Sequence, residues 1–146
     1  MDPSVVFLHD YARPLLLLHT VAGAATAGLC LHVLLNVRPS ALGRPGRVER
    51  VRRLVGWAAL ATVIVVILGL LIYPEYKVNV RVAYLDRHLP PIARLFDIKE
   101  YFALLSLPLL GFLLAGRRQL SKDASPAFRY LYGVVAGSLY SIIGLI

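Results

Sequence analysis

Cysteine is almost absent from this 146-residue chain, which contains Cys30 alone. A single cysteine excludes an intramolecular disulfide and a cysteine cluster that could bind a metal. The sequence also contains no phosphate-binding loop, no GxGxxG motif, no CxxC pair and no HExxH motif. The motifs of nucleotide-dependent enzymes, disulfide-exchange enzymes and zinc hydrolases are therefore missing, and no catalytic residue is predicted.

Charge is also scarce, because only 16% of the residues are charged whereas 58% are hydrophobic and the mean hydropathy is +0.69. A water-soluble domain of this length would mix polar and apolar residues more evenly. Four long stretches carry no formal charge when histidine is neutral: residues 14–37, 54–74, 101–116 and 130–146. A helix that crosses a bilayer needs about 20 apolar residues. The sequence therefore predicts an all-α, integral-membrane four-helix bundle.

We expect the spanning helices at about 10–37, 54–74, 98–116 and 128–146, in a single domain that covers residues 1–146. The residues before the first stretch hold two acids and one arginine instead of a basic region, which favours a true span over a signal peptide.

The segment 75–100 is predicted to be a long outer loop between the second and third helices. Alternating valines at 78, 80 and 82 predict a short strand there, and residues 92–96 predict an interfacial helix.

Positive charge is concentrated in two short connections of the predicted bundle. Residues 38–53 contain six arginines and one glutamate, and residues 117–129 contain three arginines, one lysine and one aspartate. The positive-inside rule places both connections in the cytoplasm and both chain termini outside. The net charge of +8 is then a signal of orientation and of contact with anionic lipid, and nucleic-acid binding is not expected. The arginine-rich composition favours the inner (plasma) membrane of a bacterium.

The four histidines are the candidate haem ligands. His19 and His32 lie inside the first apolar stretch, where an unpaired imidazole is costly, and His9 and His88 lie near its predicted outer side. An imidazole nitrogen can ligate haem b, and no metal other than a haem iron is expected. Thirteen residues separate His19 from His32, so their rings should point about 140° apart on a helix and meet different neighbours. The alternative for His32 is a structural hydrogen bond, for which Asn36 lies one turn away.

A second group of polar residues is a candidate quinone site. Tyr73, Glu75 and Tyr76 end the second predicted helix, and Lys99 and Glu100 begin the third. If these helices are antiparallel neighbours, the groups meet at the outer interface. Tyr73, Glu75 and Glu100 could there bind a quinol headgroup and accept its protons, or they could serve as interface anchors.

Small residues mark a helix-packing face near the end of the chain. Gly133, Gly137 and Ser141 recur at four-residue steps in the last predicted helix. This spacing lets another helix backbone approach closely, either within the bundle or from another subunit.

In size and helix count, the chain resembles the small membrane-anchor or cytochrome b subunits of electron-transfer complexes. The resemblance is one of architecture and assigns no residue a role. It implies a small subunit of a larger respiratory or other electron-transfer complex, which would help to hold a b-type haem or a quinone. Such a subunit transfers electrons or is non-catalytic, and its partners are other membrane subunits, lipid and a periplasmic protein at residues 75–100. The alternatives are a purely structural subunit without a cofactor and a small channel or transporter.

Overall fold

A computed structural model describes residues 8–42, 44, 47–121 and 123–145, and all regular structure in this part of the chain is helical. The four long helices are α1 (Ala12–Ala41), α2 (Val48–Glu75), α4 (Pro90–Gly116) and α5 (Pro126–Leu145). The three short ones are the 3-10 helix η2 (His9–Tyr11), the π-helix η3 (Tyr76–Leu85) and α3 (Asp86–His88). The prediction of an all-α protein is confirmed.

Three continuous helical stretches are long and apolar enough to cross a membrane: His9–Ala41, Val48–His88 and Pro90–Gly116. Most of their apolar side chains lie on the outside of the molecule, including Leu17, Leu70 and Leu104, which are each more than 60% exposed. A surface of this kind is stable in lipid or against another protein, but not in water. The expectation of a helical membrane protein is confirmed at this level.

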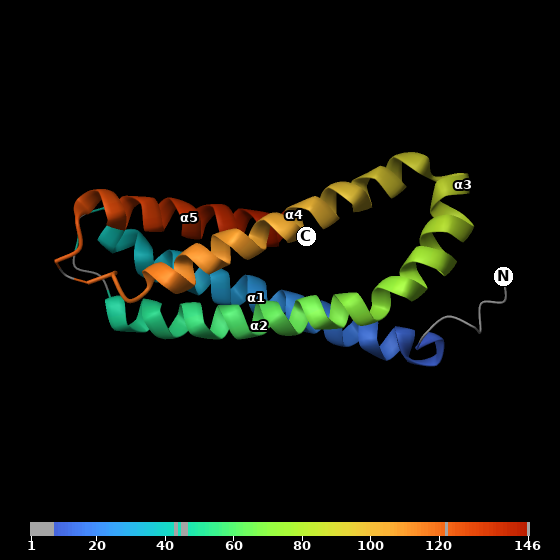
Figure 1. The fold of residues 1–146 in the computed structure, drawn as a ribbon, viewed down its shortest axis with the longest axis horizontal. Coiled ribbons are helices and arrows are strands. Elements are labelled where there is room, and N and C mark those ends of the chain that lie inside the picture. The colour runs from blue at the N-terminus through green and yellow to red at the C-terminus, as the bar shows by residue number, and fades with distance from the viewer. Residues whose placement is uncertain (1–7, 43, 45–46, 122, 146) are drawn as a thin grey trace.

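The long helices pack in the order α2, α1, α5, α4 (Figure 1). α1 and α2 form an extensive antiparallel pair, and α5 packs against both α1 and α4. The buried core is apolar and includes Cys30, Val37, Val55 and Leu113. Tyr132 of α5 is also fully buried, and its hydroxyl donates a hydrogen bond of 2.7 Å to the carbonyl oxygen of Leu113 in α4. Apolar packing and this one internal polar bond therefore hold α5 to α4.

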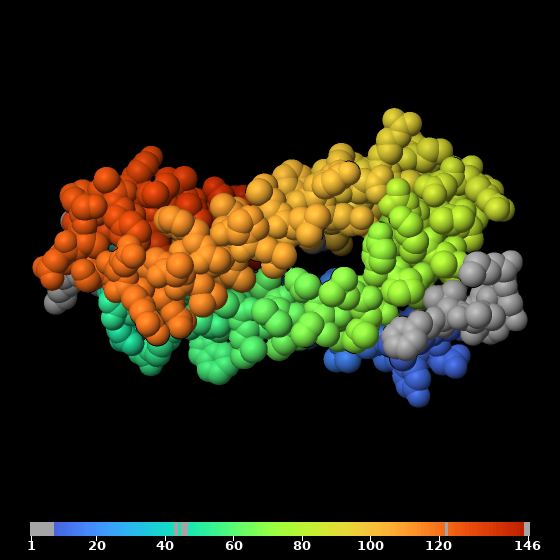
Figure 2. Space-filling view, in the orientation of Figure 1, coloured from blue at the N-terminus to red at the C-terminus, as the bar shows by residue number. Residues whose placement is uncertain are grey.

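The two ends of the molecule differ. We call the end with residues 42–47 and 117–125 the loop end, and the end with η2, η3 and α3 the η3 end. All four long helices come together at the loop end, but α5 ends before the η3 end is reached (Figure 1). α2 and α4 make few contacts with each other, and toward the η3 end an opening separates them (Figure 2). We call this opening the α2–α4 gap.

The prediction of an outer loop at residues 75–100 is wrong. This segment is helical except at Leu89, where the chain reverses direction between α3 and α4. α2 continues directly into η3 and α3, and α4 begins at Pro90. The predicted strand is wrong for the same reason. An isolated strand would leave its backbone groups without partners, whereas a helix satisfies them within one segment. The double proline is compatible with helix here because it occupies the first turn, where an N–H group would have no acceptor within the helix.

The small-residue face of α5 points toward α1. A Cβ atom placed on Gly133 would lie 2.7 Å from the Cβ atom of Ala41, and one placed on Gly137 would lie 3.7 Å from Cδ1 of Leu34. Ser141 is exposed, and its hydroxyl donates to the carbonyl oxygen of Gly137 at 3.0 Å. The close approach at Gly133 therefore occurs inside this chain, between α5 and α1.

Candidate functional site

His19 lies in the first half of α1, and its ring faces α2. Its Nδ1 atom is 3.1 Å from the carbonyl oxygen of Val65. The ring fits because residue 69 is glycine: a Cβ atom there would lie 3.2 Å from Cε1 of His19. Because a carbonyl oxygen only accepts, Nδ1 is the protonated nitrogen of the neutral imidazole and Nε2 keeps its lone pair. The Val65 carbonyl thus orients the ring and leaves one nitrogen able to bind a metal ion or a donor.

On α4, the ammonium group of Lys99 lies over the ring of Phe96, with its Nζ atom 5.9 Å from the ring centroid.

His32 occupies a different side of α1 from His19 and is exposed. The residues one and two turns away on the same side, Ala24, Gly28 and Leu35, are exposed as well. Asn36 donates from Nδ2 to the backbone carbonyl of His32 at 2.8 Å, so its amide is used on the backbone and not on the ring. Within the described part of the chain, no hydrogen bond or ring contact reaches the His32 imidazole. His32 therefore presents an imidazole to whatever surrounds α1.

The other two histidines have partners at the η3 end. Nδ1 of His9 is 3.0 Å from Oε2 of Glu75. The ring of His88 contacts that of Tyr84, with centroids 5.0 Å apart. No group of three or more histidine, cysteine or acidic side chains that could hold a metal ion occurs in the described residues.

A network of polar and aromatic contacts joins η3 to α4. Arg81 donates from Nη2 to Oδ2 of Asp97 at 3.0 Å, and its Nε is 3.8 Å from Oδ1 of Asp86. The rings of Tyr76 and Phe96 have centroids 5.2 Å apart. The hydroxyl of Tyr76 is buried and has no hydrogen-bond partner in the described part of the chain. These contacts close the α2–α4 gap at the η3 end.

The three predicted quinone residues lie in different settings. Glu75 is already engaged, because its Oε1 accepts from Nδ2 of Asn79 at 2.8 Å and its Oε2 contacts His9. Tyr73 is 38% exposed, and the ammonium of Lys77 lies 5.8 Å from its ring centroid. Glu100 is half-buried on α4. Among the described residues of this region, the buried polar atom without a hydrogen-bond partner is instead the Tyr76 hydroxyl. The sequence does not reveal this burial, so the residue could not be singled out beforehand.

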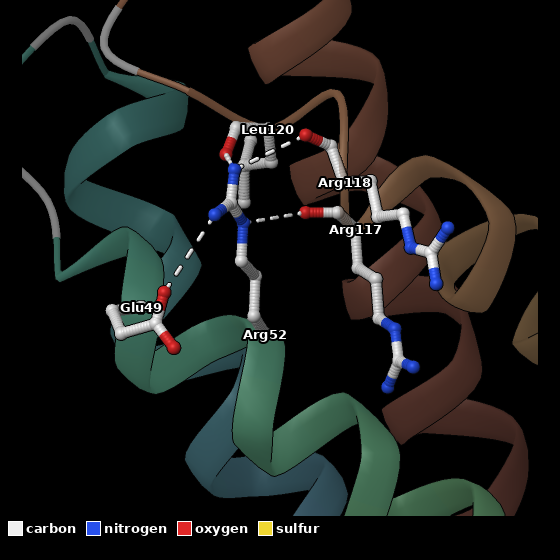
Figure 3. A network of polar contacts seen from close by, with 5 residues as sticks. All are labelled: Glu49, Arg52, Arg117, Arg118 and Leu120. Atoms are coloured by element: carbon white, nitrogen blue, oxygen red, sulfur yellow. Dashed lines mark hydrogen bonds and ion pairs between the residues drawn. The ribbon is translucent and has the colours of Figure 1, made fainter.

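At the loop end, Arg52 of α2 joins three backbone carbonyls at the end of α4 (Figure 3). Its Nε donates to the carbonyl of Arg117 at 3.0 Å, and its Nη2 donates to those of Arg118 at 3.1 Å and Leu120 at 3.2 Å. Carbonyls at a helix C-terminus lack partners within the helix and attract a cation. We predicted only orientation from this basic segment, so the contact was missed. Two features of the sequence could have indicated this contact: an arginine near the start of α2 and the end of α4 at Gly116.

Comparison with known proteins found no matching family model, no matching curated sequence and no matching solved structure.

Proposed function

We propose that this chain is a small integral-membrane subunit of a larger membrane complex, and that the His32 side of α1 contacts a helix of another chain. The observation that carries the proposal is the exposed imidazole of His32 on a helix that is apolar enough to cross a membrane. A polar group transferred into an apolar medium without a hydrogen-bond partner costs several kcal/mol. Polar residues within spans usually face other protein for this reason.

Position and neighbours support a protein partner over lipid. His32 lies six residues, about 9 Å along the helix, before Arg38, the first charged residue after the uncharged stretch of α1. Its short imidazole does not cover this distance, whereas the long side chain of Arg38 reaches the headgroup level. Ala24 and Gly28 precede His32 at four-residue steps on the same exposed side, and such small residues let a second helix approach closely.

The test is the size of the native complex after mild detergent extraction. We expect His32→Leu to release smaller species, and His32→Gln to retain the complex because glutamine still forms hydrogen bonds. Thr20→Val is the matched control, since Thr20 is also exposed on α1 but its hydroxyl already donates to the carbonyl of Leu16 at 2.9 Å. An unchanged size in His32→Leu, or a wild-type particle that contains this chain alone, would contradict the proposal.

Electron transfer is the second candidate, and His19 supports it. A histidine that ligates a metal usually donates its other ring nitrogen to a carbonyl or carboxylate, as Nδ1 of His19 does to Val65. His19 could then supply one ligand to a b-type haem through Nε2, the second ligand coming from another chain. The Tyr76 hydroxyl and the half-buried Glu100 are the groups that could meet a quinone at the η3 end.

A reduced-minus-oxidised spectrum of the purified complex tests this role. A b-type absorbance should disappear in His19→Ala and remain in His32→Gln. A complex without such absorbance would leave the purely structural subunit as the preferred function.

The orientation in the membrane also belongs to this proposal. α5 has 20 residues, a length of about 30 Å, which matches the hydrocarbon core of a bilayer and supports a fourth span. The arginines of the loop end favour the cytoplasmic side of a bacterial inner membrane for that end, with the η3 end and both termini outside.

A further inference from the structure

A groove runs between α1 and α5 at the loop end. It has a volume of about 380 Å³ and is lined mainly by apolar atoms. Leu34, Arg38 and Ala41 of α1 form one wall, and Tyr130, Gly133 and Val134 of α5 form the other. The groove exists because Gly133 and Ala41 are small at the point where the two helices touch, while the larger side chains stand on either side.

We infer that an anionic phospholipid occupies this groove, with one acyl chain between the apolar walls and its phosphate at Arg38. The depth of the residues fits this ligand. Arg38 lies in the last turn of α1 and is exposed, so its guanidinium reaches the headgroup level of the membrane. Leu34 lies one turn deeper, where the acyl chain of the same lipid would begin.

Charge complementarity favours an anionic headgroup over a zwitterionic one. Arg38 is the one charged residue among those that line the groove. The surrounding loop end adds the exposed side chains of Arg44, Arg47 and Arg50. Each basic residue near an anionic membrane surface contributes about 1 kcal/mol of attraction.

The size of the groove suits one acyl chain. Its volume of about 380 Å³ lies at the lower end of the range for small-molecule sites, which is about 300–1,000 Å³.

The experiment measures quenching by brominated lipids. The only tryptophan, Trp57, is replaced by Phe, and Tyr130→Trp places the reporter on the groove wall. The protein is reconstituted in vesicles of brominated phosphatidylglycerol or brominated phosphatidylcholine with identical acyl chains. We expect phosphatidylglycerol to associate at least about fivefold more strongly at the reporter, since one basic residue contributes about 1 kcal/mol. Arg38→Gln should lower this ratio about fivefold, and the exposed control Arg53→Gln, which does not line the groove, should lower it less.

Three outcomes would overturn the inference. Equal quenching by both lipids would show that the groove holds ordinary boundary lipid without a headgroup preference. If Arg38→Gln lowers the preference for phosphatidylglycerol no more than Arg53→Gln does, the preference comes from the general charge of the loop end. Absence of quenching by either lipid would show that protein covers the groove. If Tyr130→Trp fails to fold, as judged by circular dichroism, Val134→Trp provides the reporter from the same wall.

Discussion

Replacing Arg52 by alanine should weaken the connection between α2 and α4 more than any other change to a single arginine of the loop end. The guanidinium donates three hydrogen bonds to the carbonyls that follow α4, at 3.0, 3.1 and 3.2 Å (Figure 3). α2 and α4 otherwise make few contacts. Alanine would leave these carbonyls without their donor and would remove a cation from the C-terminal end of a helix.

The expected loss of stability in Arg52→Ala follows from the number of hydrogen bonds that Arg52 makes and from the exposure of its side chain. A hydrogen bond contributes a net of about 0.5–1.5 kcal/mol, and more when one partner is charged. The side chain of Arg52 is 36% exposed, so values at the lower end of this range apply. Three such bonds give a loss of about 2 kcal/mol in the free energy of unfolding. At about 2–4 °C per kcal/mol for a chain of this size, the melting temperature should fall by about 4–8 °C.

The assay is thermal unfolding in detergent micelles, followed by the fluorescence of Trp57. Arg52→Lys should lose about half as much stability, because lysine keeps the charge but lacks the planar group that reaches several carbonyls at once. Arg53→Ala is the matched control, since Arg53 is exposed and has no partner within the described residues. Glu49→Ala should also have little effect, because Glu49 is 71% exposed and lies 3.6 Å from the guanidinium. Equal melting temperatures for Arg52→Ala and Arg53→Ala would refute the reasoning.

Three further predictions concern packing, a surface ion pair and orientation. Gly133→Ala should destabilise the protein by about 1–3 kcal/mol in the same unfolding assay, because the new methyl group would overlap Ala41 of α1. The control Gly111→Ala should be nearly neutral, because a methyl group there would meet nothing within 4 Å. Glu75→Gln should cost less than about 1 kcal/mol yet accelerate amide hydrogen exchange in η2, and unchanged exchange would show that the carboxylate does not hold η2 in place. Arg47→Cys and Arg87→Cys place thiols at exposed positions of opposite ends of the molecule. In intact cells, an impermeant thiol reagent should label the cysteine at position 87 and not the one at position 47, and the reverse pattern would invert the proposed orientation.

The sequence predicted the helical class because uncharged stretches of bilayer length have few other structures available. It failed at residues 75–100, where charged residues and alternating valines were interpreted as a loop and a strand. Those charges are used in contacts between helices, such as that of Arg81 with Asp97. Composition cannot distinguish a polar loop from a helix whose polar groups pair with another helix, because the pairing depends on residues that are distant in sequence.

The positions of the individual histidines could also be predicted only in part. The helical repeat was enough to predict that His19 and His32 point in different directions. It could not give the acceptor of His19, since that acceptor is the backbone carbonyl of Val65, and backbone carbonyls leave no mark in a sequence. The space for the ring depends on Gly69 in the facing helix, and its relevance to His19 is visible only once α1 and α2 are placed side by side.

Side chains connect the continuous α2–η3 stretch to α4, or to the residues that follow it, at both ends of the molecule. Arg52 ties the start of α2 to the end of α4, and Arg81 and Tyr76 tie η3 to the beginning of α4. Between these ties the α2–α4 gap stays open (Figure 2). The gap therefore lies between two sets of specific side-chain contacts, one at each end of the molecule.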